Sequence, residues 1–398
     1  MASKFHQSSV VVKANIKSLY RRLWISVSMV VSIALVVVVL IGFLAMARGF
    51  ETALESAGSD KVAVVLAGGT RDEKGSDIPS AVLHQLAAAP AGLGIAEAGG
   101  AAMISRELVV AVDAPLKSSG EMQTLSLRGM DPAGATLRPN VQLSAGRMAQ
   151  PGSAELVVGA EIADRYMGFG LGETVSFGTT RWTVVGRFDA GGSAFGSEIW
   201  ADLSAVQALF KKEGDVQSLR IGLSQGADET ALAAYLQSAV ATPVAVVTEK
   251  QYFSAQSQRM SRLIRLFGWP IAIVMAIGAT AGALNTMLSS VSDRAVEIAT
   301  LRAIGFSAAA AFTGTWAEAL LLTLAGAAAG VAVSLVVFTG FTASTQAGGG
   351  QIAFDLQVTA QIVAQAGGLA LIIGLFGGAL PALKAARMPL MQAMRSVS

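Results

Sequence analysis

Charged side chains gather between Asn285 and Gly305 in the segment NTMLSSVSDRAVEIATLRAIG, and long apolar segments flank it on both sides. Arg294 and Glu297 lie three residues apart, a spacing that puts both on one face of a helix and allows an ion pair. Arg302 adds a second cation toward the end of the segment. The chemistry that this pattern suits is recognition through charge.

Apolar residues are interleaved with these charges and would add contact area to the same helix. Leu301 lies beside Arg302, and Gly305 can end the helix before the next apolar segment begins. The stretch 293–305 is longer than a turn requires. It therefore predicts a short coupling helix that docks on another protein, with an ordinary charged connecting loop as the alternative.

Residue types needed for common enzyme chemistry are scarce. The chain has no cysteine, and its two histidines, His6 and His84, lie far apart in sequence. No phosphate-binding G-x-x-x-x-G-K-[ST] motif, H-E-x-x-H or G-x-S-x-G occurs. Gly168, Gly170 and Gly172 fall between a predicted helix and a predicted strand, which is the wrong order for a nucleotide site. We expect a non-enzymatic chain that binds no cofactor and no metal.

The composition indicates that these charges lie on a membrane protein. The chain has 398 residues, of which 53% are hydrophobic and 14% charged, with a mean hydropathy of +0.56. A bilayer core of about 30 Å needs roughly 20 apolar residues in a helix. Four stretches meet that length and predict transmembrane helices, at 24–47, 266–292, 312–341 and 360–383. The first is too long for a signal peptide and predicts a retained anchor.

Basic residues predict the orientation, because they concentrate in cytoplasmic segments. Five lie before the first predicted span and three follow the last, without an acid among either group. Both termini and the 293–305 segment are therefore expected in the cytoplasm. Residues 1–23 predict an amphipathic N-terminal helix or simply a basic flank, and 384–398 predict a cytoplasmic tail. The segment 342–359 predicts a short loop on the outer side.

The segment 48–265 predicts an α/β (α+β) domain outside the membrane, between the first and second spans. Short branched runs at 155–159, 174–177, 181–188, 219–223 and 243–247 predict strands, and 203–210 predicts a helix. The polar stretch 68–77 predicts an exposed loop. Helical patterns at 249–265 and 46–54 run into the adjacent spans and predict stalks.

Within the predicted spans, one acid and three pairs of glycines stand out. Glu318 is costly in lipid and predicts a contact with a neighbouring helix or with the 293–305 segment, rather than a proton relay, which would need several acids. Glycines four residues apart let helices approach closely, and chance matches are the alternative in a chain this rich in glycine. The pairs are Gly278 and Gly282, Gly326 and Gly330, and Gly374 and Gly378.

The same residues resemble the signature of MacB/FtsX-type ABC transporter permeases, which form the type VII ABC superfamily. The segment Asn285–Gly305 fits N-T-M-x-x-x-V-S-x-R-x-x-E-I-x-x-L-R-A-I-G, and PALKAARMP at 381–389 resembles the family's ending. Glu318 followed by Gly326 and Gly330 is similar to its third span. ELVVG at 155–159 and GETV at 172–175 resemble its MacB-like periplasmic core domain.

The resemblance implies a multi-pass protein of the bacterial inner membrane that works as a permease by mechanotransmission. Two copies of a separate ATPase would bind ATP and Mg²⁺, since about 23 residues precede the first span. Carried over by position, Arg294, Glu297, Leu301 and Arg302 would face that ATPase, with Gly305 ending the coupling segment. A second permease subunit is implied: a homodimer is favoured and a heterodimer stays open.

The resemblance leaves the substrate open. A MacB-like exporter with a periplasmic adaptor is the leading interpretation, and lipid or lipoprotein extraction is a further form of it. An FtsX-like scaffold that activates a periplasmic partner without transport is the alternative, and a secondary transporter is the weakest. Membrane lipids are expected partners, and nucleic acid is not, because the net charge is only +2.

Overall fold

The computed structural model describes residues 4–18, 23–90, 92–347 and 350–388. They divide into two compact units. The helical unit comprises Met1–Arg48, Arg262–Phe341 and Leu356–Ser398. The sheet unit comprises Gly49–Ser261 and Thr342–Asp355.

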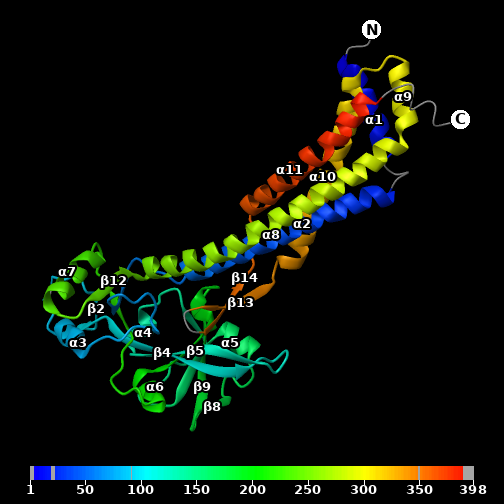
Figure 1. The fold of residues 1–398 in the computed structure, drawn as a ribbon. Helices are drawn as coiled ribbons and strands as arrows, with labels where there is room; N and C mark the ends of the chain where they lie inside the picture. Colours follow the sequence, from blue (N-terminus) through cyan, green and yellow to red (C-terminus); the bar gives the residue numbers. More distant parts are fainter. Residues whose placement is uncertain (1–3, 19–22, 91, 348–349, 389–398) are drawn as a thin grey trace. The chain divides into compact units, whose positions relative to one another are not determined.

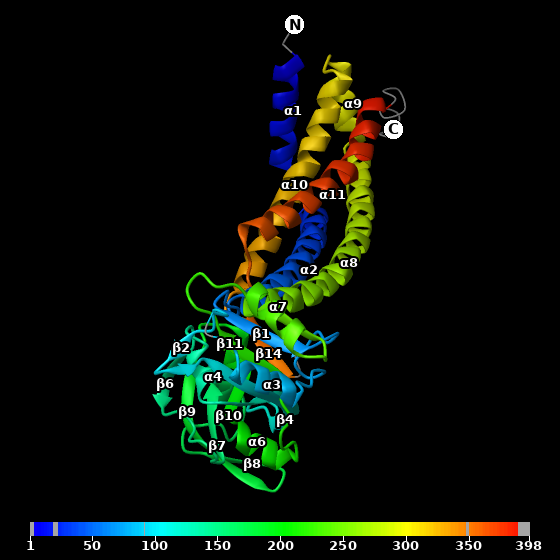
Figure 2. The same cartoon turned by 90° about the vertical axis from the view of Figure 1, so that its left-hand side faces the viewer.

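Long apolar helices form the helical unit, and four of them have the length and composition to cross a membrane. Figures 1 and 2 show α10 and α11 running side by side, and buried residues of α2, α8, α10 and α11 form one apolar core. The helices are α1 (Lys4–Ser18), α2 (Leu23–Glu55), α8 (Glu249–Asp293), α9 (Ala295–Ala303), α10 (Ala308–Phe338) and α11 (Ala360–Arg387).

The helices are longer than the apolar runs from which they were predicted. The helix α2 continues eight residues past the predicted end of the first span, to Glu55. The helix α8 runs unbroken through Pro270 for 45 residues, so the pattern at 249–265 and the span at 266–292 belong to one helix. Hydropathy marks only the part that suits lipid, whereas backbone hydrogen bonding continues through polar turns.

The N-terminal helix lies within the stretch 1–23, for which an amphipathic helix or a basic flank was predicted. The structure has α1 at Lys4–Ser18. Val11 and Asn15 are buried among its described side chains. Residues 1–3 and 19–22 of the predicted stretch lie outside the described residues, as does the tail from 389 onward.

A sheet of ten strands organises the sheet unit, with β4 and β5 near the middle of the strand order (Figure 1). Neighbouring strands follow the order β12-β1-β11-β4-β5-β10-β7-β9-β6, and β8 pairs with β9. The strands are β1 (Val62–Ala67), β4 (Ile104–Pro115), β5 (Met122–Met130), β6 (Gln142–Gly146), β7 (Glu155–Gly159), β8 (Thr174–Phe177), β9 (Thr180–Asp189), β10 (Glu198–Asp202), β11 (Ser218–Gly222) and β12 (Val244–Thr248). A separate pair is β2 (Glu97–Ala98) with β3 (Ala101–Ala102).

Two apolar cores pack against this sheet. One surrounds the buried Trp182 and includes residues of α5 and α6, and the other lies under α3 and α7. The short helices are α3 (Ser80–Ala87), α4 (Ala133–Thr136), α5 (Ala160–Arg165), α6 (Leu203–Phe210) and α7 (Glu229–Ala239), and a 3₁₀ turn spans Ala194–Ser197. Alternating strands and short helices in these ranges match an α+β domain.

The connection between α10 and α11 is a hairpin instead of the short loop predicted at 342–359. It pairs β13 (Thr342–Ala347) with β14 (Gly350–Asp355), and it belongs to the sheet unit. Ala353 donates its backbone N–H to Ser197 Oγ at 2.9 Å, and the Phe354 ring meets Phe50 edge-on at 5.5 Å. The domain was predicted from the segment between the first and second spans alone. In the structure it also includes the hairpin between the third and fourth spans.

Candidate functional site: two buried charge clusters

Arg294 occupies the single residue between the end of α8 and the start of α9. Its Nη1 lies 3.1 Å from Glu318 Oε2 on α10, and its Nε lies 3.2 Å from Glu297 Oε2 on α9. Its Nη2 donates to Asn15 Oδ1 on α1. We call these four residues the Arg294 cluster. It joins three helices and the junction of α8 with α9, at the end of the helical unit where α1 and α9 lie in Figure 1.

Burial fixes the direction of the Arg294 side chain. Arg294 is 8% exposed and Glu318 is 5% exposed, so the guanidinium points into the chain toward Glu318. The physical reason is the Glu318 carboxylate, which would be strongly destabilising if buried without a cation. Glu297 differs, because its side chain is 65% exposed and only one edge meets Arg294.

The remaining residues predicted for the coupling segment spread around α9. Leu301 and Arg302 are half-buried, and Arg302 Nη1 donates to the Met388 carbonyl at 2.8 Å. Gly305 has a φ of +103°, which favours glycine and ends the helical path two residues after Ala303. Val296 and Ile304 are exposed apolar residues on the same segment. The exposed surface of α9 thus carries Glu297 among apolar side chains.

Sequence reasoning missed Asn15 and the role of α1. Val11 and Asn15 lie one helical turn apart, and both approach Gly314 on α10 where no side chain would fit. Gln7 Oε1 also accepts the backbone N–H of Ser307 at 3.3 Å. The available signal was a polar Asn four residues after a valine, a spacing that puts both on one face of a helix.

Two of the three glycine pairs pack against helices of this chain. A Cβ at Gly326 or Gly330 would lie 2.9 or 2.8 Å from the Cβ of Ile33 or Val37 on α2. Gly374 and Gly378 likewise meet α10, at Thr323 and Ala319.

The pair on α8 differs from that prediction. Gly278 and Gly282 have nothing within 4 Å of an added Cβ among the described residues. Glycine spacing alone does not say which face of a helix meets a neighbour.

A second and larger charge cluster lies inside the sheet unit. Its members come from separate strands, loops and helix ends, and no sequence pattern links them. We call it the sheet cluster, and it consists of Glu73, Glu107, Arg128, Arg138, Glu198, Arg220 and Glu249. Glu73 belongs to the stretch 68–77, predicted as an exposed loop, yet it is only 6% exposed.

Glu107 is the centre of the sheet cluster. Its carboxylate lies 2.8 Å from Arg128 Nη1, 2.8 Å from Arg138 Nη2 and 2.9 Å from Arg220 Nε. Glu73 bridges Arg128 and Arg220 at 3.0 and 3.1 Å, while Ser218 Oγ donates to it at 2.7 Å.

The outer members of the sheet cluster extend it to other elements. Glu198 forms an ion pair with Arg128, with Oε1 and Nη2 2.6 Å apart. Glu249, the first residue of α8, forms an ion pair with Arg220 Nη1. Pairs of this kind fix the strands and the start of α8 to one another.

Two carboxylates of the sheet cluster, those of Glu73 and Glu107, stay charged. Burial opposes the charge on Glu73, but Arg128 and Arg220 outweigh it and lower the pKa of its carboxyl to about 2. Burial likewise opposes the charge on Glu107, and Arg138, Arg220 and Arg128 hold its pKa well below the ordinary value. Permanently ionised, fully paired carboxylates are poor acids or bases, so this arrangement suits mechanical fastening and not proton transfer.

No group of three or more His, Cys, Asp or Glu in the described part of the chain is placed to hold a metal ion. The two charge clusters hold helices and strands together through ion pairs.

Comparison with known families covers most of the chain. Residues 26–239 match the family described as MacB-like periplasmic core domain, and residues 269–390 match the FtsX-like permease C-terminal family. The first match takes in α2 and most of the sheet unit, and the second takes in most of α8 together with α9, α10 and α11.

Relatives with curated names are similar at low identity. The pyoverdine export ATP-binding/permease protein PvdT of Pseudomonas entomophila is 26% identical over 62% of this chain and 38% of its own. The macrolide export ATP-binding/permease protein MacB of Neisseria gonorrhoeae is 24% identical over 72% of this chain and 47% of its own. The chain therefore spans less than half the length of these relatives.

Two solved structures are also similar, at TM-scores too low to support any argument. The periplasmic region of MacB from Actinobacillus actinomycetemcomitans aligns at 12% identity and a TM-score of 0.38, over 49% of this chain and 92% of that one. The extracellular domain of YknZ from Gram-positive bacteria aligns at 14% identity and 0.35, over 47% and 100%. The family matches rest on sequence, and by them this chain is a member of the MacB/FtsX-type ABC transporter permeases.

Proposed function

We propose that the chain is a permease subunit that couples ATP hydrolysis by a separate ATPase to movement of its sheet unit, by mechanotransmission, for export or extraction of a substrate. The observation that carries this is the geometry of α9. It is a nine-residue helix joined directly to the long α8, fixed at its base by Arg294 and bearing an exposed Glu297. The start of α9 is held by the Arg294 cluster, while Glu297 on the same helix is exposed. This combination suits a helix that receives force from a docked partner.

The helix α8 offers a path for that force. At about 1.5 Å per residue, a helix of its length extends about 67 Å, more than twice the bilayer core. One end lies next to Arg294, and the other end is Glu249 within the sheet cluster. We infer that a continuous helix with ion pairs near both ends passes a displacement along its length.

The proposal places both termini and α9 in the cytoplasm and the sheet unit on the outer side of the inner membrane. Two ATPase copies, holding ATP and Mg²⁺, would bind a pair of permease subunits. The names of the two relatives point to export, of pyoverdine in one case and macrolides in the other. The substrate of this chain, an adaptor and the identity of the second permease stay open.

The test is charge reversal at the exposed acid. Glu297→Lys is expected to abolish copurification of the ATPase from host membranes, or to reduce its stimulated ATP hydrolysis about ten-fold or more, because a docking contact becomes repulsive. The melting temperature should change little, since the Glu297 side chain is 65% exposed.

Glu121→Lys is the matched control, because it makes the same charge change at an exposed acid between β4 and β5. It should leave ATPase binding intact. A Glu297→Lys chain that bound and stimulated the ATPase fully would overturn the assignment of α9. An intact ATPase complex that activated a cell-wall hydrolase without moving any substrate would favour the scaffold alternative.

A further inference from the structure

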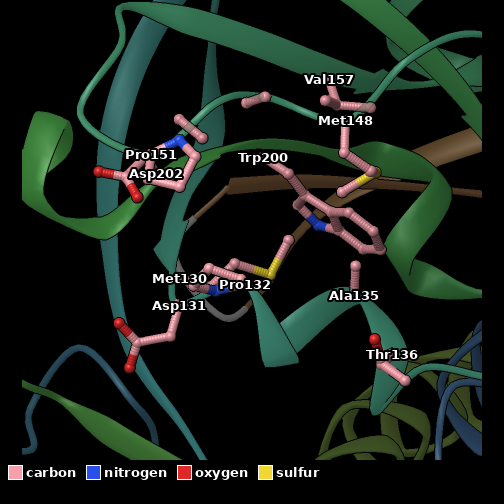
Figure 3. A pocket seen from close by; sticks show the side chains of 12 residues that line it. Met130, Asp131, Pro132, Ala135, Thr136, Met148, Pro151, Val157, Trp200 and Asp202 are labelled. Atoms are coloured by element: carbon pink, nitrogen blue, oxygen red, sulfur yellow. The ribbon is translucent and has the colours of Figure 1, made fainter. Parts of the chain in front are cut away.

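A pocket of about 190 Å³ opens on the sheet unit beside α4 (Figure 3). Its floor comes from the ends of β5 and β10 and the middle of β7, and its walls come from α4 and from the chain that leads from β6 to β7. Neither the charge clusters nor the proposed coupling uses it. A cavity of about 150 Å³ accepts a benzene ring, so this one has room for a ring with a short chain.

One end of the pocket is apolar. Trp200, Met130 and Val157 form it and are buried, while Met148 is 38% exposed at the mouth. The indole is held in place, because its N–H donates to Glu198 at 2.8 Å and its ring stacks on Phe188 at 4.0 Å. A rigid ring beside two adaptable thioethers suits a flat or branched apolar group.

The other end is acidic. Asp131 and Asp202 are the only ionisable residues that line the pocket among those the structure describes, and in Figure 3 both carboxylates lie on one side of the view with Trp200 on the other. Arg106 meets Asp131 through two bonds of 2.8 and 2.9 Å. The pKa of Arg106 is raised chiefly by its bond with Asp131 and, to a smaller extent, by Asp202. Arg106 therefore pairs with Asp131 and neutralises its charge.

Asp202 is the carboxylate of the pocket that can accept a further hydrogen bond. Its Oδ1 accepts the backbone N–H groups of Ser204 at 3.1 Å, Ala205 at 3.3 Å and Gly152 at 3.0 Å. These bonds fix the side chain as the N-cap of α6. No described side chain forms an ion pair with Asp202, and none of its hydrogen bonds uses Oδ2. A positioned carboxylate at a concave mouth with one excess negative charge favours a cation.

We propose that this pocket binds a small amphiphilic ammonium compound, with an apolar group of one ring or one branched chain against Trp200 and Met130 and the ammonium at Asp202. The site does not depend on ATPase docking or transport. Its test therefore succeeds or fails separately from the proposed function.

The probe is phenethylammonium, with 2-phenylethanol and 3-phenylpropionate as neutral and anionic relatives of similar size. The full chain is reconstituted in lipid nanodiscs with methyl-¹³C methionine, and Met130 and Met148 are assigned by single Met→Leu variants. Phenethylammonium should shift these two methyl signals saturably. The neutral probe should bind about three- to ten-fold more weakly, and the anion should bind more weakly still.

Two variants sharpen the test. Asp202→Asn keeps the N-cap, because Asn and Asp cap helices equally well, and should remove the preference for the cation over the neutral probe. Ala135→Trp should fill the pocket and abolish the shifts while the other methionine signals stay in place. Equal binding of all three probes to the unsubstituted chain, or shifts confined to other methionines, would overturn the proposal.

Discussion

The sheet cluster and the Arg294 cluster both pair arginine with glutamate, but they differ in how far their members are buried. In the sheet cluster, three arginines pair with four glutamates, and every side chain in these ion pairs is at most 13% exposed. In the Arg294 cluster, one arginine pairs with two glutamates, and the Glu297 side chain is 65% exposed. The first arrangement holds buried elements together. The second does so at Glu318 and leaves most of the Glu297 side chain at the surface.

Removing the central acid of the sheet cluster should have the largest effect. Glu107→Gln leaves three arginines facing a neutral amide and should lower the free energy of unfolding by about 3 to 5 kcal/mol, the usual result of breaking a buried ion network. Thermal unfolding of the full chain in detergent, followed by tryptophan fluorescence, measures it. Glu155→Gln is the control, because its pair with the half-exposed Arg147 lies at the surface, where solvent screens the charges and the loss of stability should be small. Comparable losses in the two variants would refute the central role of Glu107.

Breaking the Arg294 cluster should cost somewhat less, about 3 kcal/mol. Arg294→Met leaves the buried Glu318 carboxylate without its cation. The double variant Arg294→Met, Glu318→Met should recover most of that stability, since two apolar side chains of similar volume replace the pair. Unfolding midpoints of the single and double variants give the comparison. If the double variant were as unstable as the single one, Arg294 would be stabilising the junction mainly through Asn15 and Glu297.

Acid should weaken the sheet cluster only at low pH. The folded pKa of Glu73 is about 2 against an ordinary value of 4.5, so its contribution is complete above about pH 4.5 and is lost as the pH falls toward 2. The expected slope is about 1.4 kcal/mol per pH unit for each proton taken up. Unfolding followed from pH 7 to pH 2 should therefore stay level down to about pH 5 and then decline. A decline that began near pH 6 would show that other groups dominate.

The smallest expected effect comes from substituting glycines at helix contacts in the helical unit. Gly330→Leu would push a side chain into Ala34 and Val37 on α2 and should cost about 1 to 3 kcal/mol. Gly278→Leu on α8 meets open space and should be nearly neutral in the single chain in micelles. Unfolding midpoints measure both. Equal losses would mean that glycine itself, and not close helix contact, matters at both positions.

Particular residues show which features of the two charge clusters could be predicted from the sequence. Arg294 and Glu318 were both marked as important, because charges next to or within apolar runs are costly wherever they lie. The inward turn of Arg294 could not be predicted, since three-residue spacing from Glu297 suits an exposed pair equally well. The sheet cluster escaped prediction because consecutive members are separated by 10 to 60 residues along the chain. Glu73 in particular sits in a stretch whose polarity suggested an exposed loop.

The sequence by itself determined the four long apolar helices, the folded segment between the first two, the short helix near 293–305 and the family. Each of these rests on local composition or on the period of apolar residues, which a single stretch of chain carries. Only the tertiary structure decided which charges are buried, that the 342–355 hairpin joins the sheet unit, that α1 packs on α10 and which glycines touch a neighbour. These depend on contacts between distant segments, where the cost of burying an unpaired charge selects partners that no local pattern records.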